Sequence, residues 1–206
     1  MKFRIIKKLV LLSVFFTPVG VLADSVRISD ENAHFYYDAN ADIKTPAHKL
    51  AEFISSDYRN ARDEFTKHDL FQQIKPVIDK RLAKAKNTKT VHVRISVNLE
   101  NYDFGKKAFA TGIGATTYIP LDNNYAVTFT NAEKIKFLSV PINSARKLSK
   151  ELGNDRRSNF IIQGVITGAK EESLGRWGGT KKAIKVKITK IEVTLKSGTK
   201  VGTNKL

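Results

Sequence analysis

The chain has 206 residues, of which 36 are Lys or Arg and 20 are Asp or Glu, so that its formal net charge at pH 7 is +16. Its length is typical of one domain with a sizeable core. Cysteine is absent, which excludes disulfides, thiolate metal sites, a Cys nucleophile and the lipid-attachment Cys of a bacterial lipoprotein.

Residues 1–23 have the layout of a secretory signal. Four cations and no acid precede Leu9, an apolar run interrupted by polar residues follows, and small residues lead to Ala23. The run is too short and too interrupted for a spanning helix. We therefore expect cleavage before Asp24 and a mature protein in the periplasm or outside the cell.

The positive charge is concentrated in the second part of the chain. Residues 24–104 carry 13 basic and 13 acidic side chains, whereas residues 105–206 carry 19 basic and 7 acidic ones. A basic region of this kind favours an anionic partner, such as lipid head groups, envelope glycopolymers or extracellular nucleic acid, although no motif supports nucleic acid. The alternative is that the charge keeps the protein soluble.

The first part of the mature chain reads as helical. Residues 33–37 are rich in aromatic side chains and predict an edge strand or a docking arm. Thr45-Pro46 then starts a helix. Its apolar stripe recurs at helical spacing over about five turns, at Leu50, Ile54, Tyr58, Ala61 and Phe65. A second helix runs from about residue 70 to 85. Asp69 is its expected N-cap, and Pro76 either kinks it or marks its start.

From Thr90 the hydrophobic period changes to two, which is typical of a half-buried strand through residue 99. Residues 108–119 form a weaker candidate strand, 122–124 a turn, 125–129 a further strand and 135–140 another. A helix follows Pro141, with Asn143 or Ser144 as its N-cap, and Gly153 ends it. We expect its inward face to consist of Ala145, Leu148 and Leu152.

The last fifty residues predict a long hairpin with one irregularity. Its arms are residues 160–168 and 183–195, and in the second arm the apolar positions switch from even to odd numbers between Ile188 and Ile191. A straight strand would turn half of these side chains to solvent, so a β-bulge near Thr189-Lys190 is expected. Ser197-Gly198 then turns the chain into a short strand through Val201.

These elements predict an α+β fold in which an N-terminal helical hairpin packs on a mainly antiparallel, twisted β-sheet, with one further short helix. We expect one domain over residues 24–206, helical at about 45–87 and β-rich at about 90–203.

The candidate binding site is a set of cations on the outer face of the last hairpin, together with the Trp at its tip. It consists of Lys182, Lys185, Lys187, Lys190, Arg176, Trp177, Arg156 and Arg157. Lysines on an outer strand face also protect a sheet edge or keep it solvated, and the Trp can also fold back as a lid on the sheet.

Signals for catalysis are weak. Thr111–Thr116 has two glycines without the spacing of a phosphate-binding loop and predicts close backbone packing. The four histidines lack paired metal spacing, so we expect surface or capping roles and no metal or cofactor. The preferred hypothesis is a non-enzymatic exported protein that binds an anionic envelope component or a protein. The alternatives are an envelope-polymer hydrolase with a site between helices and sheet, and a structural subunit of an envelope assembly.

Overall fold

Two long strands form the centre of the structure, a computed structural model that describes residues 25–122, 124–175 and 179–206. Strands β8 (Arg157–Ser173) and β9 (Thr180–Leu195) pair antiparallel along almost their whole length. Each half of this hairpin has different neighbours. The first half of β8 pairs with β2 (Thr90–Asn98), and β9 pairs with both β6 (Tyr125–Phe129) and β10 (Lys200–Lys205).

In the described residues the main sheet has seven strands in the order β1-β2-β8-β9-β6-β5, with β10 also paired to β9. Strand β1 (Ser25–Arg27) is parallel to β2, and β6 is parallel to β9, while the remaining pairs are antiparallel. Strand β5 (Tyr118–Pro120) closes the far end. The α+β prediction is confirmed, and the sheet is a mixed one.

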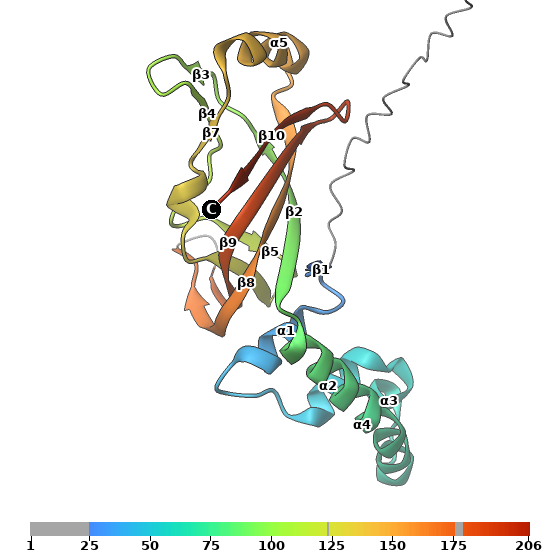
Figure 1. The fold of residues 1–206 in the computed structure, drawn as a ribbon. Coiled ribbons are helices and arrows are strands. Elements are labelled where there is room, and N and C mark those ends of the chain that lie inside the picture. Colours follow the sequence, from blue (N-terminus) through green and yellow to red (C-terminus); the bar gives the residue numbers. More distant parts are fainter. Residues whose placement is uncertain (1–24, 123, 176–178) are drawn as a thin grey trace, which may run out of the picture.

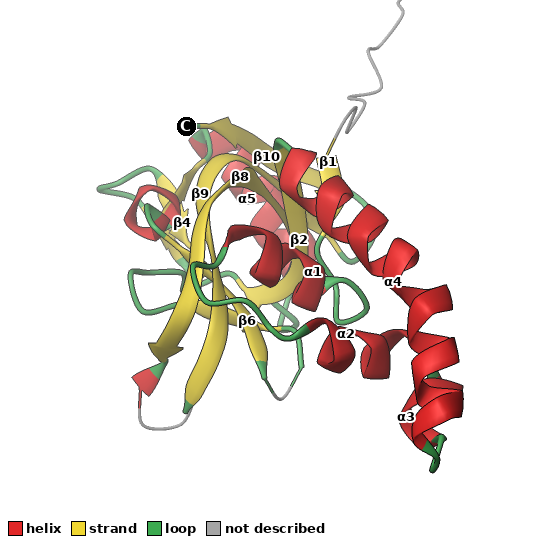
Figure 2. Ribbon diagram, turned by 90° about the horizontal axis from the view of Figure 1, so that it is seen from below, coloured by secondary structure: helices red, strands yellow, loops and turns green. Residues whose placement is uncertain are grey.

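The sheet curls so that its two ends approach each other (Figure 2). One cleft of about 640 Å³ is lined both by Val93 and Arg94 of β2 and by residues 119–121 around β5. The concave side holds the main core, where apolar side chains of β2, β6, β8 and β9 pack together.

A small second sheet and two helical segments fill one end of this core. The sheet consists of β3 (Tyr102–Asp103), β4 (Ala108–Ala110) and β7 (Phe137–Ser139), and the 3-10 helix η1 (Ala132–Ile135) precedes β7. Helix α5 (Ile142–Leu152) lies beside β3 at the top of Figure 1 and buries Ala145, Leu148 and Leu152, as predicted. Its N-cap is Pro141, so the prediction of Asn143 or Ser144 is wrong, and Gly153 ends it with a φ of 52°.

The helices at the other end differ most from expectation. Residues 33–37 belong to helix α1 (Ala33–Asn40), not to a strand or arm, and this helix is buried because α4 covers one side and the sheet the other. Helix α4 (Glu64–Asn87) packs against α1, α2 and α3. In the described part of the chain, no helix combines the length and apolar character needed to cross a bilayer.

The expected helix over residues 45–65 is broken in two, α2 (Ala47–Ile54) and α3 (Ser56–Asn60). Ser55 has extended backbone, and its Oγ accepts a hydrogen bond from the Tyr58 amide at 3.1 Å, which starts α3. Leu50 and Tyr58 still pack in one apolar cluster with α4. Phe65, in contrast, is 76 % exposed.

Helix α4 begins earlier than predicted. Asp63, not Asp69, is the N-cap, because its carboxylate accepts a hydrogen bond from the Thr66 amide at 2.8 Å. Pro76 lies inside the helix. It removes one donor to the Gln72 carbonyl, and both residues are exposed, so that water can satisfy this carbonyl.

The predicted bulge is confirmed at Thr189. Gln163 pairs with Lys190 and Gly164 with Ile188, so Thr189 is the extra residue. Ile188 and Ile191 are consequently both buried on the concave side. A second irregularity, which the sequence did not indicate, places an extra residue at Thr167 of β8.

We expect Gly164→Ala to destabilise the protein, because a Cβ at this position would lie 2.4 Å from the Lys187 carbonyl oxygen. Overpacking of this kind costs about 1–3 kcal/mol. The control is Gly202→Ala, whose Cβ would meet Leu138 at an ordinary 3.7 Å and should change the free energy of unfolding by about 0.5 kcal/mol or less. Urea unfolding measures both, and equal effects would contradict the role given to Gly164.

Candidate anion-binding face

A row of polar side chains crosses five strands of the main sheet on its outer side. Residues that face each other on neighbouring strands project their side chains to the same side. The strand register gives one continuous line of such partners: Arg27, His92, Gln163, Lys190 and Lys205. Since neighbouring strands are about 4.8 Å apart, the row is about 19 Å long.

Adjacent positions on the same side add further cations. Arg94 follows His92 by two residues on β2. Lys187 of β9 lies opposite Val165 of β8, and Lys200 of β10 lies opposite Thr194 of β9. Together with the row they form a surface that we name the basic face, made of Arg27, Arg94, Lys187, Lys190, Lys200 and Lys205. All are exposed except Lys190, which is partly buried.

Few carboxylates oppose this charge. Within the described residues, the register places Glu192 among these cations, with its Oε2 3.7 Å from Lys190 Nζ and 3.8 Å from Lys200 Nζ. Asp30 and Glu31 line the cleft next to Arg27 at the β1 margin. With Glu192 as the one carboxylate that the register places among the six cations of the described residues, the face keeps a net positive charge.

His92 lies on β2 next to two cations of the basic face: Arg27 is its partner on β1, and Arg94 follows it by two residues on the same strand. The side chain is 8 % exposed, and its Nδ1 is 3.0 Å from the Ser25 hydroxyl. Burial lowers the pKa of His92, and the charges of Arg94 and Arg27 lower it further, while a hydrogen bond from the ring to the Ser25 backbone raises it. Of the surface or capping roles expected for the histidines, a surface position is therefore wrong for His92.

Four of the eight predicted binding residues project to the outer side of the sheet. Lys187 and Lys190 belong to the basic face, and Lys185 lies on the same side of β9. Lys185 Nζ is 2.8 Å from Glu172, which also pairs with Lys170. Arg157 lies opposite Asn98 at the end of β8 and pairs with Asp155 at 3.3 Å.

The other predicted residues lie elsewhere. Arg156 donates to the backbone carbonyls of Leu99 and Glu100. Lys182 projects to the concave side, where its Nζ is 3.1 Å from Thr45 Oγ1 and lies over the rings of Tyr37 and Tyr125. Arg176 and Trp177 lie outside the described residues. The predicted set is thus not a single site.

Sequence reasoning missed four cations of the basic face. Arg94 occupies a polar position in the clearest alternating strand, and this alternation could have identified it. Arg27, Lys200 and Lys205 lie on β1 and β10, whose pairing partners no local pattern reveals.

A buried polar cluster lies between α1 and the concave side of the sheet, near Lys182. His34 and Asp38, one turn apart on α1, are 5 % and 2 % exposed. Asp38 Oδ1 accepts from the Thr45 amide at 2.9 Å. His34 Nε2 and Asp38 Oδ2 have no hydrogen-bond partner among the described residues. Phe53 of α2 stacks on the His34 ring, with centroids 4.8 Å apart.

Burial dominates the titration of this cluster. It lowers the pKa of His34 to about 4, with a smaller lowering from Arg81 and opposing effects of Asp38 and Asp122. Burial also raises the pKa of Tyr125, and the neighbouring carboxylate of Asp38 raises it further. A surface position, one of the two roles expected for the histidines, is wrong for His34 as well.

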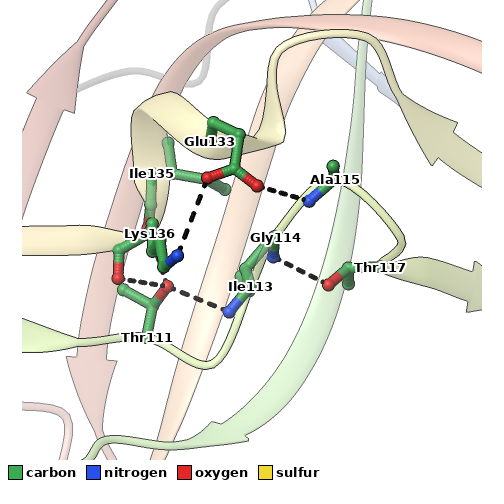
Figure 3. Close-up of polar contacts among 8 residues, drawn as sticks. All are labelled: Thr111, Ile113, Gly114, Ala115, Thr117, Glu133, Ile135 and Lys136. Atoms are coloured by element: carbon green, nitrogen blue, oxygen red, sulfur yellow. Dashed lines mark hydrogen bonds and ion pairs between the residues drawn. The ribbon is translucent and has the colours of Figure 1, made fainter.

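The glycine-containing loop between β4 and β5 uses its amides internally (Figure 3). Gly114 N donates to Thr117 Oγ1 at 2.9 Å, and Ala115 N donates to Glu133 Oε1 at 2.8 Å. Thr111 Oγ1 donates to the Ile135 carbonyl at 2.7 Å. These amides are therefore bonded to protein side chains, in keeping with a packing role.

Three comparisons limit what can be transferred from other proteins. Residues 50–151, from α2 to α5, are similar to a family model described as "Domain of unknown function (DUF4852)". No curated protein and no solved structure matches the chain. Among residues 25–122, 124–175 and 179–206, no three His, Asp or Glu side chains are grouped as a metal ion would require. The matched segment includes β2 but not β8, β9 or β10, which carry most of the basic face.

We expect acid to destabilise the protein through His34. Its pKa is 6.5 in the unfolded chain and about 4 in the fold, so a proton binds preferentially to the unfolded state. The stability contributed by neutral His34 is complete above pH 6.5 and is lost as the pH falls towards 4. The total is on the order of 3 kcal/mol.

Urea unfolding at pH 7.0, 5.5 and 4.5 measures this effect. His34→Gln removes the titrating ring and should flatten the decline in the free energy of unfolding, whereas the exposed His48→Gln should leave it unchanged. Parallel declines in wild type and His34→Gln would show that His34 is not the group responsible.

Proposed function

We propose that this chain is an exported, non-enzymatic protein that binds an extended polyanion of the cell envelope through the basic face. The observation that carries the proposal is the cross-strand row from Arg27 to Lys205. The basic face around this row places six cations against Glu192 among the described residues, and the row joins strands that are far apart in the sequence.

The chemistry of the row suits phosphate or carboxylate groups. Lys ammonium groups and Arg guanidinium groups are donors only, and Arg can hold either anion through two parallel hydrogen bonds. The Gln163 amide and the partly shielded Lys190 lie between the Arg end and Lys205. A polyanion would release counterions along this line, which makes the affinity strongly dependent on salt.

The shape of the face favours a polymer over a small ligand. The cations follow a sheet surface for about 19 Å, whereas small-molecule sites are enclosed clefts. A flexible chain with regularly spaced anionic groups can contact several of these cations at once, and each contact can be weak.

The export part of the proposal depends on residues 1–23, which lie outside the described residues. Their cationic start, apolar run and small residues before Asp24 support a cleaved signal. A periplasmic or extracellular site would bring the basic face to anionic envelope polymers.

The hydrolase alternative has one specific observation in its favour. Nε2 of His34 and Oδ2 of Asp38, which have no hydrogen-bond partner among the described residues, lie between helices and sheet, where such a site was expected. A buried group with a shifted pKa, such as His34, is typical of active sites. Phe53 stacks on the His34 ring, however, and a substrate would have to displace it.

The proposal predicts that Lys187→Gln/Lys190→Gln/Lys205→Gln weakens binding to an anionic matrix. On phosphocellulose and carboxymethyl cellulose, the variant should elute at clearly lower salt than wild type. Its binding to soluble polyphosphate should fall at least tenfold and depend less steeply on salt, because three charge contacts are lost.

The matched control is Lys67→Gln/Lys80→Gln/Lys84→Gln on the exposed side of α4, which removes the same charge elsewhere. It should elute close to wild type. If both triple variants lose equal retention, the protein binds by net charge alone and the proposal fails. Circular dichroism and urea unfolding confirm that each variant is folded.

A further inference from the structure

A second, partly apolar cleft is lined by residues of α5 and β3. These two elements lie side by side at one end of the molecule (Figure 1). Its volume is about 380 Å³, within the usual range of small-ligand sites. The side chains that matter for its chemistry are Tyr102, Phe104, Ile142, Ala145, Arg146 and Lys150.

The apolar walls of the cleft are arranged around the Tyr102 ring, which other residues hold in place. Tyr102 donates its hydroxyl to the Val140 carbonyl at 2.8 Å and contacts the Phe109 ring edge-on, with centroids 5.1 Å apart. Phe104 meets Tyr102 edge-on at 5.3 Å yet is 72 % exposed. Ile142, at the start of α5, is 50 % exposed. Covering such large apolar side chains with a ligand removes them from water, which favours binding.

The charged part of the cleft is exclusively positive. Arg146 and Lys150 are one turn apart on α5, both are exposed, and the described lining contains no carboxylate. Neither cation forms an ion pair within the described residues. Charge complementarity therefore selects an anionic head group next to the apolar walls.

We propose that this cleft binds a single-chain anionic amphiphile, with a carboxylate or phosphate head on Arg146 and Lys150 and its alkyl chain between Phe104 and Ile142. A concave site of this size holds one chain, in contrast to the extended polymer on the basic face. The proposal uses none of the cations of that face, so the two proposals can fail separately.

Isothermal titration calorimetry with monomeric ligands tests the proposal on the whole chain. Hexanoate, octanoate and decanoate should bind with dissociation constants that fall by up to about fourfold for each added CH₂. Decyl phosphate tests the phosphate head. Decanol and decyltrimethylammonium keep the chain length without the negative charge and should bind at least about tenfold more weakly.

Two double variants separate the charged and apolar contributions. Arg146→Gln/Lys150→Gln should weaken decanoate binding about tenfold or more, while Lys134→Gln/Lys147→Gln, with the same change in charge outside the cleft, should not. Phe104→Ser/Ile142→Ser should remove the dependence on chain length. Because Phe104 and Ile142 are exposed, their replacement should leave the unfolding midpoint close to wild type.

Three results would overturn the proposal. They are the absence of decanoate and decyl phosphate binding, equal binding of anionic and cationic decyl ligands, and equal loss in the two charge variants. Binding to anionic phosphatidylglycerol vesicles without binding of the monomeric ligands would show that the surface contacts a membrane instead. Retention on the anionic matrices is a separate measurement, so failure here leaves the basic face untouched.

Discussion

The extra residue at Thr189 allows one strand to have two consistent faces. Without it, Ile188 and Ile191 could not both be buried on the concave side, and Lys187 and Lys190 could not share the outer one. Since β9 pairs with β8, β6 and β10, an error of register there would propagate through the sheet. The close approach of Gly164 to Lys187 fits the same irregularity. Core formation and the alignment of the cations thus depend on one local feature.

Polar groups have different environments on the two sides of the main sheet. On the outer face, most of the cations are exposed, and burial and the neighbouring Arg94 lower the pKa of His92. Under α1, His34 and Asp38 are enclosed, and burial of His34 makes folding sensitive to acid. The enclosed cluster therefore couples stability to pH, whereas the accessible face offers charge to a partner. This contrast is why we assign binding to the sheet and not to the helical side.

Local patterns predicted the elements whose environment is simple. Alternation identified β2 because one of its faces is solvated, and the phase change of apolar residues located the bulge of β9. Helix α1 was missed because a helix covered on both sides has no polar stripe. The break at Ser55 was missed because a stripe can continue across a helix interruption. The row from Arg27 to Lys205 was missed because its register arises from pairing between distant segments, which no local pattern encodes.

The most direct test of the basic face uses His92 as a reporter within the row. Its pKa can be measured by NMR of the imidazole resonances, with and without saturating polyphosphate at low salt. A polyanion bound along the row would offset the charges of Arg27 and Arg94, so we expect the pKa of His92 to rise when polyphosphate binds. A pKa of His92 that stays unchanged while the polymer is demonstrably bound would place the binding site elsewhere and contradict the account.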